Sequence, residues 1–164
     1  LSPPDRTRMI GIHLEGPFIN PAAKGCHPAN AIIQPDMDDV QILVSPNTRL
    51  MTMAPEVDAE GELTHFLFER GVRVCAGHSQ ASTAQIDKAI DKGLRGVSHL
   101  FNAMPGLHHR QPNLTSKALQ DDRLFVSVIA DGIHVDKDLL FMPLRCKNPK
   151  AVVLISDAMA LAGM

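Results

Sequence analysis

Apolar residues along the chain fall into two alternating kinds of segment. Short, nearly continuous apolar runs, typical of strands buried in a parallel sheet, occur near residues 8–14, 49–54, 72–77, 96–99, 124–130 and 151–156. Between several of these runs, apolar residues recur at the three- and four-residue spacing of a helix that faces a core. The alternation predicts an α/β fold built on a mostly parallel sheet.

Two intervening segments predict helices with defined ends. The first closes at Gly71, and the second begins from Ser82 or Thr83 and stops at Gly93, because hydroxyl residues cap helix starts and glycine favours helix ends. The apolar stripes of these helices consist of Leu63, Phe66 and Leu67 in the first and Ile86, Ala89 and Ile90 in the second.

Three other segments have weaker patterns. Helices are predicted near 115–120 and 136–143, the second ending at Met142 and Pro143. The segment 20–46 is rich in Pro, Ala and Asn and has no sustained period. We expect it to be a long functional loop with some local helix.

Composition narrows the class of protein. The chain has 164 residues, 45% of them apolar and 21% charged, with a net charge of −2. This balance is typical of a soluble globular protein and favours neither nucleic-acid nor membrane binding. No apolar stretch approaches the roughly 20 residues of a membrane span, and the first residues do not resemble a signal peptide, so a cytoplasmic location is expected. Three cysteines without CxxC spacing argue against a disulfide framework or a cysteine zinc site.

Several of the apolar runs end in an acid or a histidine, namely Glu15, His78, His99 and Asp157. In a β/α barrel, side chains at the carboxyl ends of parallel strands converge on one rim. One carboxylate and two imidazoles suit a divalent transition metal, which leaves an aspartate for proton transfer. The pattern therefore predicts a metallohydrolase on a β/α barrel. A complete barrel typically needs about 250 residues, so we expect residues 1–164 to be part of one.

Six motifs occupy strand ends or the loops that follow them. They are residues 13–18 (HLEGPF), 24–27 (KGCH), 76–79 (AGHS), 98–104 (SHLFNAM), 130–136 (ADGIHVD) and 156–160 (SDAMA). In this order they resemble N-acetylglucosamine-6-phosphate deacetylase of the amidohydrolase superfamily. The resemblance implies a TIM-barrel-type (β/α) metallohydrolase in which residues 1–164 supply the third to eighth strands. The first two strands and the small flanking β domain of the family would be absent.

The resemblance also implies catalytic roles. Glu15, His78 and His99 match the metal-binding positions of the family, with zinc as the expected ion and iron or another transition metal as alternatives. Asp157 matches the aspartate that takes a proton from the activated water and later delivers one to the departing amine. His27 matches a substrate-binding histidine that helps the metal polarise the acetamide carbonyl. Because superfamily members can carry additional ligands on the first strand, the metal count stays open.

Substrate recognition is implied for Asn102, the backbone of Ala103, His134 and Arg110. The arginine would reach the active site of a neighbouring subunit, so a homodimer is expected. The loop departs from the family pattern nearby, where Gln111 replaces a frequent Glu. The family also often has Gly at the position of Asn113. These departures leave substrate preference open.

Individual residues also have non-catalytic interpretations. Asp157 at a strand end is suited to capping a following helix. His27 and Arg110 could be ordinary exposed side chains. Cys26 beside His27 suggests an alternative in which the histidine activates a cysteine nucleophile. However, adjacent side chains usually point apart, and activated water already supplies the nucleophile. His13 and Asp131, which also lie in matched motifs, are interpreted as supporting groups.

The expected reaction is hydrolysis of N-acetylglucosamine 6-phosphate to glucosamine 6-phosphate and acetate, in amino-sugar catabolism and cell-wall sugar recycling. One alternative is a deacetylase for N-acetylgalactosamine 6-phosphate or a related sugar phosphate. The other is a non-catalytic fragment or interaction module, because six strands of an eight-stranded barrel leave two edges with unpaired backbone groups.

Overall fold

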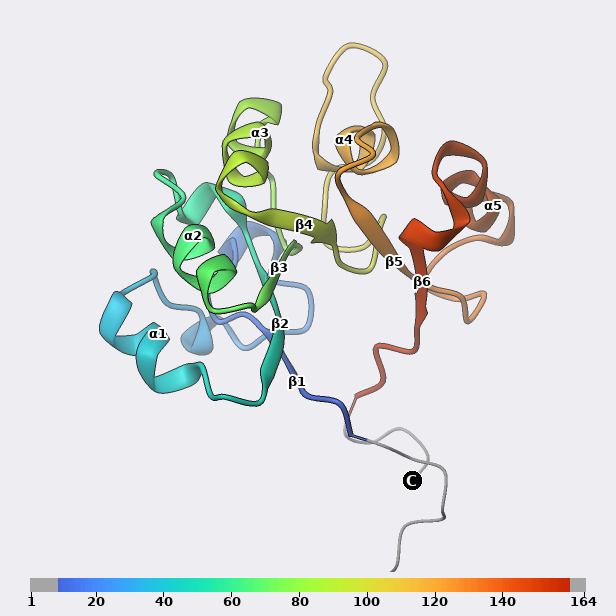
Figure 1. Cartoon of the computed structure of the whole chain (residues 1–164). Helices are drawn as coiled ribbons and strands as arrows, with labels where there is room; N and C mark the ends of the chain where they lie inside the picture. Colours follow the sequence, from blue (N-terminus) through green and yellow to red (C-terminus); the bar gives the residue numbers. More distant parts are fainter. Residues whose placement is uncertain (1–8, 160–164) are drawn as a thin grey trace, which may run out of the picture.

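The computed structural model describes residues 9–159, in which six strands form one curved sheet (Figure 1). The strands are β1 (Ile12–Glu15), β2 (Thr48–Met53), β3 (Arg73–Ala76), β4 (Leu94–Val97), β5 (Phe125–Ile129) and β6 (Val152–Ile155). They lie side by side in chain order, and every neighbouring pair is parallel. The predicted α/β class and the partial TIM barrel are thereby confirmed.

A helix follows each of the first five strands. These helices are α1 (Met37–Leu43), α2 (Glu62–Glu69), α3 (Thr83–Lys92), α4 (Leu114–Gln120) and α5 (Lys137–Cys146). Figure 1 shows them arranged around the outside of the curved sheet. None of the helices within residues 9–159 has the length and apolarity that crossing a bilayer requires.

Most predicted boundaries lie within two or three residues of the observed ones. Ser82 caps α3 by accepting a hydrogen bond from the backbone N–H of Gln85, and Gly93 ends the helix with a φ of 119°. The segment 20–46 contains α1 and two short 3-10 turns, Pro21–Ala23 and Ala29–Ala31, as expected of a loop with local helix. Residue 8 of the first predicted strand and Ala160 of the last motif lie outside the described residues.

The predicted end of the last helix is wrong. Helix α5 continues through Pro143 to Cys146, and the backbone N–H of Lys147 still bonds to the Pro143 carbonyl. Proline removes the bond to the carbonyl four residues earlier, which belongs to Leu139. Leu139 is exposed, so water can satisfy that carbonyl. The pyrrolidine ring itself is buried, and this packing favours keeping the proline within the helix.

The hydrophobic core lies between the sheet and the helices. Alternate strand residues face the helices, as the period of two in a strand requires. The buried cluster includes Met51, Met53, Val74, Ala76, Val126 and Val128 from the strands and Leu63, Leu67, Ile86 and Ile90 from α2 and α3. The other parity includes Thr52 of β2, whose hydroxyl oxygen lies 2.6 Å from that of Ser98, the residue that follows β4. The inner face of the sheet is therefore partly polar beneath the strand ends.

Candidate active site

Four polar side chains lie at the carboxyl ends of the strands. Glu15 is the last residue of β1, while His78, His99 and Asp157 each lie two residues beyond the end of β3, β4 and β6. The last three adopt left-handed backbone, with φ of 49°, 34° and 50°. Such conformations cost on the order of 1–3 kcal/mol for non-glycine residues and cluster at functional sites.

Glycine precedes His78 for a steric reason. A Cβ on Gly77 would lie 2.5 Å from Thr52 Cγ2 and 3.3 Å from Ser98 Cβ. Both neighbours belong to the polar inner face of the sheet, where little space is left. The chain therefore passes close to β2 and β4 only with glycine at this position, and this close passage brings His78 to the rim.

Glu15, His78 and His99 converge on one point. His99 Nε2 lies 2.9 Å from Glu15 Oε1, His78 Nε2 lies 3.4 Å from the same oxygen, and the two nitrogens are 3.1 Å apart. Two atoms bound to a tetrahedral zinc ion at roughly 2.0–2.1 Å lie about 3.3 Å from each other. The three atoms thus have the mutual spacing of ligands around one ion.

The tautomers of the two histidines support the same arrangement. His78 Nδ1 lies 2.9 Å from the Ala23 carbonyl oxygen, and His99 Nδ1 lies 3.2 Å from the Asn102 carbonyl oxygen. A carbonyl oxygen only accepts, so both Nδ1 atoms carry hydrogen and a neutral ring has its lone pair on Nε2. Two lone pairs and a carboxylate oxygen then face one another. Such a donor set fits a divalent transition metal.

Glu15 and His99 shift the pKa values of one another. When an imidazole also carries hydrogen on Nε2, it donates to Glu15, and these hydrogen bonds with His78 and His99 hold the pKa of the Glu15 carboxyl well below its usual range. Burial lowers the pKa of His99, but its hydrogen bond and charge interaction with Glu15 outweigh burial and leave the pKa raised. A proton on an imidazole Nε2 offsets the negative charge of the Glu15 carboxylate, as a cation bound by the same atoms would.

His27 and Asp157 border this triad. In the group Glu15, His27 and His78, and in the group Glu15, His99 and Asp157, one ligand atom of each residue lies within 4.8 Å of the others. The His27 ring packs edge-on against His78, with centroids 4.6 Å apart. Its Nδ1 donates to the Lys24 carbonyl at 3.1 Å, so its Nε2 is the nitrogen available to the site.

A pocket of about 370 Å³ opens over the triad. Its lining consists of Glu15, Gly25, Cys26, His78, His99, Asn102, Ala103, Ile129, His134, Asp157 and Met159. The structure thus gathers the three predicted metal ligands, the predicted proton-transfer residue and three of the predicted substrate residues around one space. Cys26 and Met159, whose sulfur atoms are 4.0 Å apart, are lining residues that the sequence analysis did not assign to the site.

Asp131 holds the His134 imidazole in place, in agreement with the prediction that Asp131 is a supporting group. Its Nδ1 lies 2.7 Å from Asp131 Oδ2, and Asp131 Oδ1 accepts from the backbone N–H groups of Ile133 and His134. These bonds lower the pKa of Asp131 to about 2. The carboxylate orients the imidazole so that Nε2 is left for a ligand.

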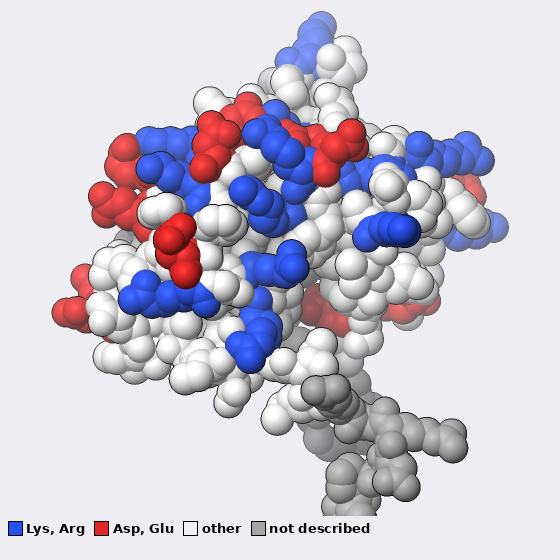
Figure 2. All heavy atoms as spheres, viewed as in Figure 1, with Lys and Arg blue, Asp and Glu red and all other residues white. Residues whose placement is uncertain are grey.

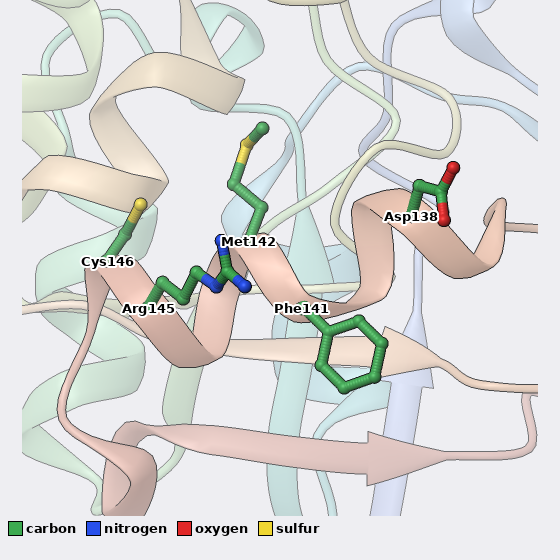
Figure 3. Close-up of a pocket in the computed structure, with 5 residues that line it drawn as sticks. All are labelled: Asp138, Phe141, Met142, Arg145 and Cys146. Carbon is green, nitrogen blue, oxygen red and sulfur yellow. The ribbon is translucent and has the colours of Figure 1, made fainter.

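Arg110 is the predicted site residue that lies apart. It is exposed in the loop before α4 and does not line the pocket. A different concavity, of about 340 Å³, lies along α5 and is lined by Asp138, Phe141, Met142, Arg145 and Cys146 (Figure 3). Its lining comes from one helix and includes none of the strand-end groups, so it offers no competing catalytic cluster.

Glu56 is a supporting residue that the sequence analysis missed. Its carboxylate accepts from Asn20 Nδ2 at 2.9 Å, from Ser79 Oγ at 2.6 Å and from the Gln80 backbone N–H at 2.6 Å. It thereby ties the loop after β1 to the loop that carries His78. Glu56 lies three residues beyond β2, so the strand-end pattern itself was the signal that could have found it.

Curated sugar-phosphate deacetylases are similar to this chain in sequence. No protein-family model matches it. It is 37% identical over 160 residues to N-acetylgalactosamine-6-phosphate deacetylase from Escherichia coli O157:H7, covering 96% of this chain and 42% of the relative. It is 34% identical over 163 residues to N-acetylglucosamine-6-phosphate deacetylase from Lysinibacillus sphaericus, covering 98% of this chain and 42% of the relative.

A solved deacetylase structure is similar to this chain in fold as well as in sequence. It is a mutant of N-acetylglucosamine-6-phosphate deacetylase from Mycobacterium smegmatis in complex with N-acetyl-D-glucosamine-6-phosphate, and it matches with a TM-score of 0.87 and 34% identity. The match covers 94% of this chain and 41% of that chain. The chain spans about 42% of the length of the curated relatives that it matches. In sequence and in fold, it is similar to the N-acetylglucosamine-6-phosphate deacetylases over nearly its whole length.

Proposed function

We propose that residues 1–164 are part of an amidohydrolase barrel domain whose site hydrolyses N-acetylglucosamine 6-phosphate to glucosamine 6-phosphate and acetate. The observation that carries the proposal is the convergence of Glu15 Oε1 with the Nε2 atoms of His78 and His99 within 3.4 Å. Asp157 faces the same pocket. The similarity to deacetylases adds support for the reaction class.

The metal would be held by Glu15, His78 and His99, with zinc as the proposed ion. When bound, it would lower the pKa of water and polarise the substrate carbonyl. Asp157 accepts the proton of the attacking water and delivers it to the amide nitrogen as the C–N bond breaks. One water is consumed: its oxygen joins the acetyl carbon, one of its protons goes to the amide nitrogen through Asp157, and the other leaves the new carboxyl group as acetate forms.

His27 supplies a second contact to the carbonyl oxygen. Because its Nδ1 donates to the Lys24 carbonyl, the ring donates from Nε2 only when both nitrogens carry hydrogen. In that form it stabilises the negative charge that develops on the oxygen. The bond to Lys24 also fixes the plane of the ring.

The sugar phosphate would be bound by Asn102, Ala103 and His134, which line the pocket. Arg110 is proposed to complete the phosphate site of a second copy in a homodimer. Its exposure and its position outside its own pocket are compatible with that role, and a guanidinium pairs well with phosphate oxygens.

A second candidate substrate is N-acetylgalactosamine 6-phosphate. It is favoured by the 37% identity to the Escherichia coli O157:H7 deacetylase named for that sugar. The two substrates differ only at one hydroxyl-bearing carbon. A direct comparison of turnover on both separates the candidates.

The test measures acetate release from both sugar phosphates by the chain after zinc or ferrous iron is added. Asp157→Asn is expected to abolish release while zinc binding persists, and Asp138→Asn, at an exposed position on α5, is the matched control. Zinc binding without acetate release from either substrate would refute the catalytic proposal for this chain. That result would favour the non-catalytic fragment instead.

A further inference from the structure

Basic side chains gather at the opposite end of the sheet from the candidate active site. Arg73 is the first residue of β3, Arg95 is the second residue of β4, and Lys150 precedes β6 by two residues. Parallel strands start at one edge, so these cations come together there. Figure 2 shows Lys and Arg side chains near the centre of the viewed face.

These residues line a pocket of about 470 Å³. Its complete lining is Arg73, Arg95, Asp122, Arg123, Leu124, Phe125, Lys150, Ala151 and Val153. The pocket shares no residue with the one over Glu15, His78 and His99. It is therefore a separate space, built by the amino-terminal ends of β3 to β6.

The charges in this pocket are not balanced. The charge of Arg123 is already paired, because its guanidinium donates to the Asp121 carboxylate at 2.9 and 2.7 Å. Arg73, Arg95 and Lys150 form no ion pair with any residue in the described range 9–159. Against these three cations the lining offers a single acid, Asp122. The pocket consequently carries an excess of positive charge.

Arg95 is held in place before any ligand arrives. Its Nη1 donates to the carbonyls of Ile90 and Leu94 at 2.7 and 2.8 Å, and its guanidinium lies 5.3 Å from the centre of the Phe68 ring. These partners are uncharged, so they orient the group and leave its formal charge uncompensated by a carboxylate. A cation fixed in this way loses little conformational freedom on binding an anion.

The rest of the lining indicates the size and kind of anion. Phe125 is half-buried and Val153 is exposed, and both add apolar surface beside the cations. Surrounding acids at Asp87, Asp91 and Asp121 disfavour an extended polyanion such as a nucleic acid. We propose that this pocket binds the phosphate group of a small phosphorylated metabolite, independently of the candidate active site. Arginine forks match phosphate oxygens in geometry and charge.

The test titrates the isotopically labelled chain with inorganic phosphate and with glucose 6-phosphate, and follows backbone amide signals by NMR. We expect saturable shifts at Phe125 and Val153, with tighter binding of glucose 6-phosphate because its carbon skeleton contacts the apolar lining. Arg73→Gln and Lys150→Gln are each expected to weaken binding about tenfold, equivalent to roughly 1.4 kcal/mol. Both positions are exposed, so the variants are expected to fold, which circular dichroism checks.

Two control variants match these changes. Arg145→Gln and Lys137→Gln neutralise exposed cations on α5, outside the pocket, and are expected to bind as the unaltered chain does. Arg110 lies in the loop associated with the proposed active site and does not line this pocket. Arg110→Gln is therefore expected to leave the shifts at Phe125 unchanged. Shifts confined to that loop and to the surroundings of Asp157 would overturn the proposal. Equal binding by Arg73→Gln, or recognition of inorganic phosphate alone, would also overturn it.

Discussion

Replacing His99 by alanine tests the proposed metal centre most directly. His99 Nε2 is one of three atoms that converge within 3.4 Å, and its side chain is 3% exposed. Structural zinc sites with four ligands bind with roughly 10–16 kcal/mol, so one ligand accounts for roughly 2.5–4 kcal/mol. The loss of this imidazole is therefore expected to weaken zinc binding by roughly 10²–10³-fold.

Zinc affinity would be measured at neutral pH by competition with a chromophoric chelator. His65→Ala is the matched control, because it removes an exposed histidine from α2, and it is expected to leave the affinity unchanged. Since His99→Ala also leaves a cavity, Glu15→Gln provides a second variant of nearly native volume, with a weaker neutral ligand. Zinc binding by both site variants as tight as that of His65→Ala would refute the proposed metal centre.

Three further outcomes follow from the fold. Gly93→Ala is expected to lower the free energy of unfolding by roughly 2–5 kcal/mol in urea titrations, because φ is 119° and the new Cβ would lie 2.6 Å from Phe68 Cβ and Cγ; an unchanged midpoint would contradict this. Ser82→Ala removes the cap that pairs with Gln85 and is expected to cost about 1 kcal/mol, measured in the same way. Burial raises the pKa of the Cys75 thiol to about 12, so a thiol reagent at pH near 8 should modify the two exposed cysteines and spare this one until the chain unfolds; rapid modification of all three would disprove its burial.

Local structure was largely predictable from the sequence because its causes are local. Alternating apolar runs and stripes located the six strands and α2 to α4, and Ser82 and Gly93 marked both ends of α3. The end of α5 was not predictable in this way, because whether Pro143 stops a helix depends on burial of its ring and on the surroundings of Leu139. Those surroundings come from packing between elements.

The sequence by itself determined which residues stand at the strand ends, since Glu15, His78, His99 and Asp157 follow apolar runs. It left open whether they meet. Glu15 and His99 are 84 positions apart, and their contact depends on sheet order, curvature and the left-handed turns after β3 and β4.

Only the tertiary structure decided the finer features of the site. It assigned hydrogen to the Nδ1 atoms of His78 and His99 through distant carbonyls, and it revealed Glu56 as the tie between two loops. It also gathered Arg73, Arg95 and Lys150 at the far edge of the sheet. Periodicity and capping are encoded over a few residues, whereas these arrangements arise from contacts between segments that only folding brings together.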